Sequence, residues 1–276
     1  MDLTNISFMK IRRQTTVLSS ILIIASISSL FINKLNFGLD FTGGSLIEIR
    51  LEEEINSLEE IRSFLQSMEL NDFQVNYFGS NKDISIKVPG GEASIDEDAL
   101  IVNLKKSFNF EVRRQEFVGP QVGSELRDQG GLGLLAALAV MMVYIMFRFQ
   151  YKFALGALLA LVHDVVIVLG FFSIFSLDFD LSVLAAILAV IGYSLNDTIV
   201  VSDRVRENFR KKRRSEAEIT INRSLSQMIG RTLITSLTTL LVLLALFIFG
   251  GETISNFSIA LMVGVISGTY SSIYIV

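Results

Sequence analysis

Long uncharged apolar runs separated by short polar segments dominate the pattern of this 276-residue chain. The first run covers residues 15–32 within an N-terminal segment, 1–33, and it follows Lys10, Arg12 and Arg13. Five more runs are predicted at about 130–148, 153–175, 181–203, 230–250 and 254–276. Each is close to the roughly 20 residues that a helix needs to cross a bilayer. The pattern therefore predicts an α-helical membrane protein with six transmembrane helices, five of them in residues 129–276.

The basic residues predict the orientation of these helices. Basic side chains precede the first span, and the densest basic run, residues 204–214, follows the fourth. The turns at 177–180 and 250–252 contain neither Lys nor Arg. Loops rich in Lys and Arg stay on the cytoplasmic side of a membrane. Both termini are therefore expected to be cytoplasmic, and residues 204–229 are expected to form a cytoplasmic amphipathic linker.

Residues 34–128, between the first and second spans, have the pattern of a water-exposed α+β domain. Alternating apolar positions predict strands around 47–51, 73–77, 84–88 and 110–112. Two helices are predicted after Ser57 and Ser94, each of which has a glutamate three residues later, as in a capping box. The order β-α-β-β-α-β is that of a ferredoxin-like, or split βαβ, domain. We expect this domain on the outer side of the membrane.

Composition and motifs argue against several kinds of chemistry. The net charge of −4 averages acidic and basic segments and so indicates little about partners. With no Cys and one His, thiolate and transition-metal sites are not expected. No phosphate loop and no dinucleotide-binding GxGxxG is found. The basic run beside a membrane span favours orientation and contact with anionic lipid over nucleic-acid binding. We expect no enzyme activity, cofactor, metal or nucleic acid.

The fourth span contains a carboxylate, Asp197, well inside an apolar helix. Because an ionisable group in lipid is costly, such a residue is a functional hypothesis by default. From the rise of 1.5 Å per residue, Asp197 lies roughly 7–8 Å from the centre of its span, and Arg231 about 13 Å from the centre of the fifth. An arginine side chain can extend across that difference. Since Arg does not release its proton, Asp197 is the candidate proton carrier and Arg231 its counter-charge. A static ion pair, or an Arg231 that reaches the interface, is the structural alternative.

His163 and Asp164 are adjacent near the middle of the third span. Because His titrates near neutral pH, the pair could extend a proton relay. A structural hydrogen bond between packed helices explains the pair about equally well. Asp203, at the inner end of the fourth span, is interpreted as a solvated cap. Four polar residues of that span could form hydrogen bonds between helices or hold water along the proton path: Ser194, Asn196, Thr198 and Ser202.

Several segments resemble the SecD/SecF family of membrane proteins. FGLDFTGG at 37–44 is similar to the family's motif after the first span, and its Phe41 favours the SecF branch. VGPQVGSEL at 118–126 resembles the segment before the second span, and residues 193–208 and 231–240 resemble the family's fourth and fifth spans. The motif positions that match are Gly38, Asp40, Gly43, Gly44, Gly119, Pro120, Asn196 and Asp203.

The resemblance implies an accessory subunit of the bacterial Sec protein-export machinery, a member of the resistance-nodulation-division superfamily in the inner membrane. The implied partners are SecD, the SecYEG channel and the translocating polypeptide, with YajC and YidC as further candidates. The family uses the proton gradient to assist late translocation, and its membrane acid and arginine fall on Asp197 and Arg231. Two alternatives stay open: a half-unit of a proton-driven small-molecule exporter, and a passive scaffold of a membrane complex.

Overall fold

The structure, a computed structural model, has two compact units. One comprises Met1–Asn36 with Gly133–Val276, and the other comprises Phe37–Leu132. The boundary falls inside a long helix, α5 (Pro120–Arg148). The residues that the structure describes are 7–54, 57–68, 70, 73–78, 80–90, 97–148, 151–211 and 216–276.

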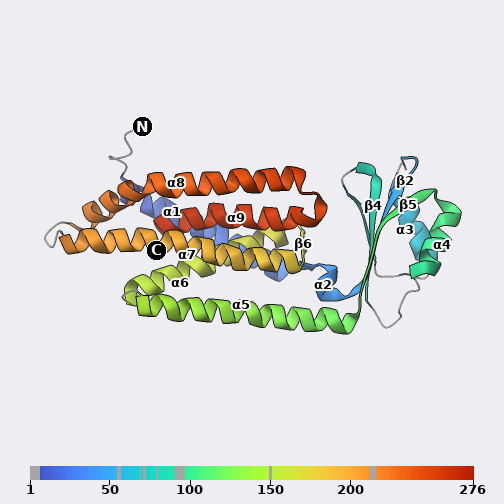
Figure 1. Ribbon diagram of the computed structural model, residues 1–276, viewed down its shortest axis with the longest axis horizontal. Helices are drawn as coiled ribbons and strands as arrows, with labels where there is room; N and C mark the ends of the chain where they lie inside the picture. The colour runs from blue at the N-terminus through green and yellow to red at the C-terminus, as the bar shows by residue number, and fades with distance from the viewer. Residues whose placement is uncertain are drawn as a thin grey trace. The chain divides into compact units, whose positions relative to one another are not determined.

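Among these residues, six helices are long and apolar enough to cross a membrane (Figure 1). They are α1 (Arg12–Ile32), which follows the short 3-10 helix η2 (Phe8–Ile11), α5, α6 (Tyr151–Ile174), α7 (Leu181–Lys211), α8 (Ala217–Phe249) and α9 (Glu252–Tyr274). Two strands of two residues each also occur. β1 (Asn36–Phe37) follows α1, and β6 (Asp178–Phe179) lies between α6 and α7. The fold class predicted from the hydropathy pattern is confirmed.

The region predicted as a linker, 204–229, belongs largely to two long membrane helices. α7 continues to Lys211 and α8 begins at Ala217, and α8 passes through Gly230 without a break. One glycine costs a helix only about 1 kcal/mol relative to alanine, so it does not end α8. Asn208 Nδ2 donates hydrogen bonds to Ser224 Oγ at 2.9 Å and to Gln227 Oε1 at 3.0 Å, which ties the two helices together. Part of the basic run, residues 212–214, lies outside the described residues.

α9 is the centre of the helix packing. It contacts α7, α8 and α6, while α1 packs mainly on α6; Figure 1 shows α8 and α9 side by side. Small residues permit these close contacts, because helices in lipid associate through tight packing. At Gly264 of α9, an added Cβ would lie 2.1 Å from Val190 Cγ2 of α7. At Gly170 of α6, it would lie 2.6 Å from the Cα of Ser26 on α1.

Gly170→Ala is expected to lower the stability of the membrane unit by about 1–3 kcal/mol, the usual cost of overpacking. The added methyl group meets the backbone of α1, which can move away only by opening the contact between α1 and α6. The measurement is thermal unfolding of the purified protein in detergent. Gly192→Ala is the matched control, because a Cβ at Gly192 has no neighbour within 4 Å. Equal unfolding temperatures for the two variants would contradict the prediction.

The second unit has the predicted order of strands and helices. It contains α2 (Leu39–Thr42), β2 (Gly44–Leu51), α3 (Glu59–Ser67), β3 (Gln74–Phe78), β4 (Ser80–Pro89), α4 (Glu97–Ser107) and β5 (Phe110–Val118). The sheet order is β3-β4-β2-β5, and each neighbouring pair is antiparallel. With α3 and α4 joining the strands, this is the split βαβ arrangement.

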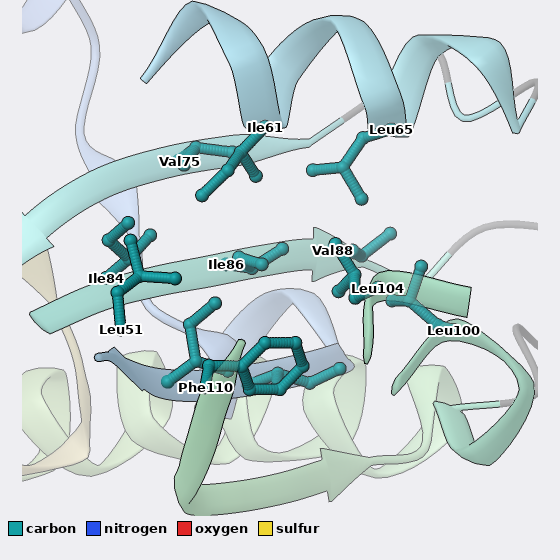
Figure 2. Close-up of a cluster of buried hydrophobic side chains, with 12 residues drawn as sticks. Leu51, Ile61, Leu65, Val75, Ile84, Ile86, Val88, Leu100, Leu104 and Phe110 are labelled. Atoms are coloured by element: carbon teal, nitrogen blue, oxygen red, sulfur yellow. The ribbon is translucent and has the colours of Figure 1, made fainter. Parts of the chain in front are cut away.

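One face of this sheet forms the core of the unit with the two helices (Figure 2). Ile49 pairs with Ile84 and Ile47 with Ile86 across β2 and β4, and all four are fully buried. Figure 2 shows Ile61 and Leu65 of α3 pointing toward the strands; Leu100 and Leu104 of α4 belong to the same cluster. The alternation read from the sequence therefore faces the core, since side chains alternate across a strand.

Only one of the two predicted helix caps lies within the described residues. Ser57 Oγ accepts a hydrogen bond from the backbone N–H of Glu59 at 3.1 Å, so this serine does contact the start of α3. The residue before α3 is Leu58, which makes no side-chain cap bond. The other predicted cap, Ser94, lies outside the described residues.

The two adjacent glycines of the FTGG motif have a structural role at the start of β2. Gly43 and Gly44 have φ angles of +66° and +116°, which side-chain-bearing residues rarely adopt. A Cβ at Gly44 would lie 2.1 Å from Val88 O, and one at Gly43 would lie 2.6 Å from Pro120 Cα. Pro120 is the first residue of α5, a position at which its fixed φ suits a helix. The motif thus allows three segments of this unit to meet closely.

The other motif positions of this unit surround that meeting point. Gly38 precedes α2 in an extended conformation, and Asp40 lies in the first turn of α2. Gly119 immediately precedes α5, and its carbonyl accepts a hydrogen bond from the N–H of Gly123 at 3.0 Å. An acidic side chain in the first turn of a helix interacts favourably with the helix dipole. These positions therefore help to form the turns around α2 and α5.

Candidate functional site

Asp164 lies at the centre of a hydrogen-bond cluster between three helices. Its side chain, on α6, is 1% exposed. Oδ2 accepts hydrogen bonds from Ser194 Oγ of α7 at 2.6 Å and from Ser271 Oγ of α9 at 2.7 Å. Oδ1 accepts one from Ser267 Oγ of α9 at 2.6 Å and lies 3.0 Å from Nδ1 of His163. Both carboxylate oxygens therefore have two polar neighbours each.

The groups around Asp164 are compatible with either protonation state. Neither Lys nor Arg forms an ion pair with Asp164 in the described part of the chain. A serine hydroxyl can donate or accept a hydrogen bond, so it can face a carboxylate and, after rotation, a carboxylic acid. A buried charge without a cationic partner is costly. The three serines can therefore stay hydrogen-bonded to either form of the side chain.

His163 extends the cluster toward α1. Its ring, 3% exposed, stacks on Tyr270 with ring centroids 6.1 Å apart. The Tyr270 hydroxyl donates to Thr15 O at 2.7 Å and is 2.9 Å from Ser19 Oγ. The second ring nitrogen of His163, Nε2, is buried and has no hydrogen-bond partner among the described residues. Buried polar atoms are usually paired, so this nitrogen is an exception to the usual pattern.

Asp197 is also held by hydroxyl groups. Thr232 Oγ1 of α8 donates to Oδ1 at 2.7 Å, and Ser272 Oγ of α9 donates to Oδ2. The structure does not bring Arg231 into an ion pair with Asp197; Arg231 is exposed. Consecutive residues of a helix point about 100° apart. Because α8 turns Thr232 toward Asp197, it turns the neighbouring Arg231 away.

Helix α9 connects the two carboxylates. Ser271 and Ser272 are adjacent in the sequence, and they donate to Asp164 and Asp197 respectively. On α7, Ser194 and Asp197 are three residues apart, a spacing that places side chains on one face of a helix. A movement of α9 would therefore change the hydrogen bonds of both carboxylates together.

The remaining predicted residues of the fourth span are not part of this cluster. Asn196 is exposed, and Thr198 and Ser202 are buried. Asp203, interpreted from the sequence as a solvated cap, forms an ion pair with Arg148 at 2.6 Å and is 34% exposed. Asp203 is also 3.8 Å from Arg206, one turn further along α7. It therefore belongs to the basic end of the bundle.

The sequence reasoning missed the serines of α9 and Tyr270. Ser267 and Ser271 have the i, i+4 spacing that puts them on one helix face. The sixth span is also the least hydrophobic of the six. These two features could have indicated a polar face on the sixth span, but they do not indicate which residue the serines contact.

The fold and site define an integral membrane protein with a ferredoxin-like domain between its first two spans and two carboxylates inside its helix bundle. The family pattern described as "Protein export membrane protein SecD/SecF, C-terminal" matches residues 99–276, and "SecD/SecF GG Motif" matches residues 28–55. The chain belongs to the SecF family, whose members are subunits of the Sec protein translocase. It is accordingly a multi-pass membrane protein that takes part in protein transport.

Relatives match over almost the whole chain. The protein translocase subunit SecF of Pseudomonas aeruginosa is 49% identical, over 98% of this chain and 89% of the relative. SecF of Escherichia coli O157:H7 is 44% identical, over 94% of this chain and 81% of the relative.

Solved structures show the same fold. The crystal structure of SecDF, a translocon-associated membrane protein from Thermus thermophilus, matches 98% of this chain with a TM-score of 0.88 and 35% identity. SecDF in its super-membrane-facing form matches with a TM-score of 0.71 at the same identity. The chain spans 37% of the length of each of these SecDF chains.

Proposed function

We propose that this chain pairs with SecD in the bacterial inner membrane and couples the proton gradient to late steps of protein translocation through the SecYEG channel. Membership of the SecF family supports this proposal, as does the likeness to SecDF, a longer chain of which this one spans 37%. SecD would supply the remaining part. Both termini would be cytoplasmic. YajC and YidC are further candidate partners. The proposed role is transport of a polypeptide rather than catalysis.

The observation that supports proton coupling best is the pair of serines, Ser271 and Ser272, on two intramembrane carboxylates. A carboxylate only accepts hydrogen bonds, whereas a protonated carboxyl group also donates one. Proton uptake at Asp197 therefore changes whether Ser272 donates or accepts its hydrogen bond. It thereby changes the hydrogen bonds that hold α9 to the two carboxylates. Because α9 packs against α6, α7 and α8, this change can reach most of the bundle.

Arg231 would be the second partner of Asp197 in this cycle. Thr232 and Arg231 are consecutive in α8, so a rotation of α8 by about 100° exchanges one for the other. A guanidinium beside a carboxyl group stabilises its charged form. A carboxylate surrounded only by hydroxyl groups in lipid lacks this stabilisation. We propose that this exchange sets when Asp197 releases its proton, with His163 and Asp164 as a second site.

The test is proton flux measured together with export. Inverted vesicles contain this chain, SecD and SecYEG, with a pH-sensitive dye inside and an imposed proton gradient. The proposal expects that an engaged polypeptide increases proton flux and that the gradient increases the yield of export. A passive scaffold predicts the same yield with and without the gradient. A half-unit of a small-molecule exporter predicts a proton flux that does not depend on the polypeptide.

A further inference from the structure

A cavity of about 760 Å³ lies between η2, α1, α6, α7, α8 and α9, at the end of the bundle that carries the basic residues. Its walls are mainly apolar and include Val201 and Phe209 of α7, Leu225 of α8 and Ile273 of α9. This volume is within the roughly 300–1,000 Å³ typical of ligand sites, which are mostly apolar with a few polar groups. The cavity is separate from the cluster around Asp164, and it meets the surroundings of Asp197 only at Ser272.

Two arginines line one side of the cavity. Arg12 and Arg13 are exposed, lie in the first turn of α1 and form no ion pair with any described carboxylate. The same turn contains no acidic residue, and Ile11 makes no side-chain cap bond. An anionic group beside Arg12 and Arg13 would give both guanidinium groups the negative partner that no described residue supplies.

A third polar residue lies in the wall of the cavity. Ser202 of α7 is 2% exposed, and its Oγ has no hydrogen-bond partner in the part of the chain that is described. A buried hydroxyl without a partner costs free energy, because it has lost its bonds to water. An acceptor bound in the cavity would restore such a bond.

We infer that this cavity binds one anionic phospholipid, with its phosphate at Arg12 and Arg13, an acyl chain along the apolar wall, and an ester oxygen accepting from Ser202. The apolar walls match an acyl chain, and the two arginines match the negative headgroup. Basic residues at the cytoplasmic surface attract anionic lipids in this way. A neutral lipid would leave the two cations unpaired, and water alone would leave the apolar walls unfilled. The inference concerns binding and does not depend on the proton-coupled function.

Fluorescence quenching can test this binding, because the chain contains no Trp. Phe209→Trp places a single Trp in the cavity wall, where it reports on an acyl chain inside the cavity. Phe249→Trp is the matched control, since Phe249 is 85% exposed and lies outside the cavity lining. Each variant of the full chain is placed in bilayers of phosphatidylcholine that contain a small fraction of phosphatidylglycerol with brominated acyl chains.

The expected result is strong quenching of the Trp at 209 at lipid fractions that barely quench the Trp at 249. Adding R12Q and R13Q should weaken the apparent affinity by about 25-fold, because each basic residue near the surface contributes roughly fivefold. Brominated phosphatidylcholine should quench both reporters alike. Inorganic phosphate should not displace the lipid, because it lacks the acyl chain.

Three results would overturn the inference. They are equal quenching of the two reporters by brominated phosphatidylglycerol, preferential quenching at 209 by brominated phosphatidylcholine, and an affinity unchanged by R12Q with R13Q. Should the Trp at 209 disturb folding, native mass spectrometry of the unmodified chain gives the same answer. One retained phosphatidylglycerol per chain, lost in the R12Q and R13Q variant, is expected; no retained lipid would contradict the site.

Discussion

An Asp197→Asn variant is expected to assemble with SecD and yet to lose all stimulation of export by a proton gradient. Asparagine has nearly the same shape as aspartate, and its side-chain oxygen can still accept the hydrogen bond that Thr232 Oγ1 donates to Oδ1. Its amide can donate to Ser272, whose hydroxyl can also accept. The packing of α7, α8 and α9 should therefore survive. The amide does not take up a proton near neutral pH, so only the titration is removed.

Export from inverted vesicles, measured with and without an imposed gradient, gives the readout for Asp197→Asn. Asp203→Asn is the matched control on the same helix, because Asp203 is ion-paired with Arg148 at the basic end of the bundle. Surface ion pairs contribute about 0–1 kcal/mol, so this control should behave like the wild type. Gradient-dependent export by Asp197→Asn, together with normal assembly, would reject Asp197 as the proton carrier.

The second large effect is expected at Asp164, where two substitutions should separate packing from titration. Asp164→Ala leaves the hydroxyls of Ser194, Ser267 and Ser271 without their shared acceptor. Hydrogen bonds between membrane helices average about 0.6 kcal/mol each. The cavity left by the carboxylate adds to that cost. The total loss of stability is expected to be about 2–4 kcal/mol.

Asp164→Asn should instead keep the stability of the wild type, because its oxygen and amide can pair with the same serines. It also removes a buried carboxylate that pairs with neither Lys nor Arg in the described part of the chain, which can itself be stabilising. If Asp164 belongs to the relay, this stable variant loses gradient-dependent export. Unchanged export would assign His163 and Asp164 to structure alone.

Thermal unfolding in detergent and the export assay, applied to the same preparations, distinguish these outcomes. Ser258→Ala is a control within α9, since Ser258 is fully buried but donates to Ile254 O of its own helix at 2.8 Å. It should unfold close to the wild type. Ser271→Ala, which removes a donor to Asp164, should be less stable than this control. The reverse order would contradict the cluster as a source of stability.

Some of the site could be read from the sequence because the signals are local. An acid such as Asp197 in an apolar run is identified by its neighbours alone, and so is the adjacent pair His163 and Asp164. Local patterns also predicted the strands of the second unit, where Ile47, Ile49, Ile84 and Ile86 alternate toward one core. They did not predict where the helices end. Polar residues such as Arg204 and Asn208 read as a linker, but they extend α7, because contacts with α8 hold them in helical form.

By itself, the sequence determined the six spans, the β-α-β-β-α-β order and the identity of the two membrane acids. These follow from periodicity and hydropathy, which depend on residues close together in the chain. Only the tertiary structure decided which groups surround the acids. Ser271 lies 107 residues from Asp164, and Ser272 lies 75 residues from Asp197. No spacing indicates such contacts, because they depend on how α9 is rotated against α6 and α7. The rotation of α8 likewise turns Thr232, and not Arg231, toward Asp197, since neighbouring positions on a helix point about 100° apart.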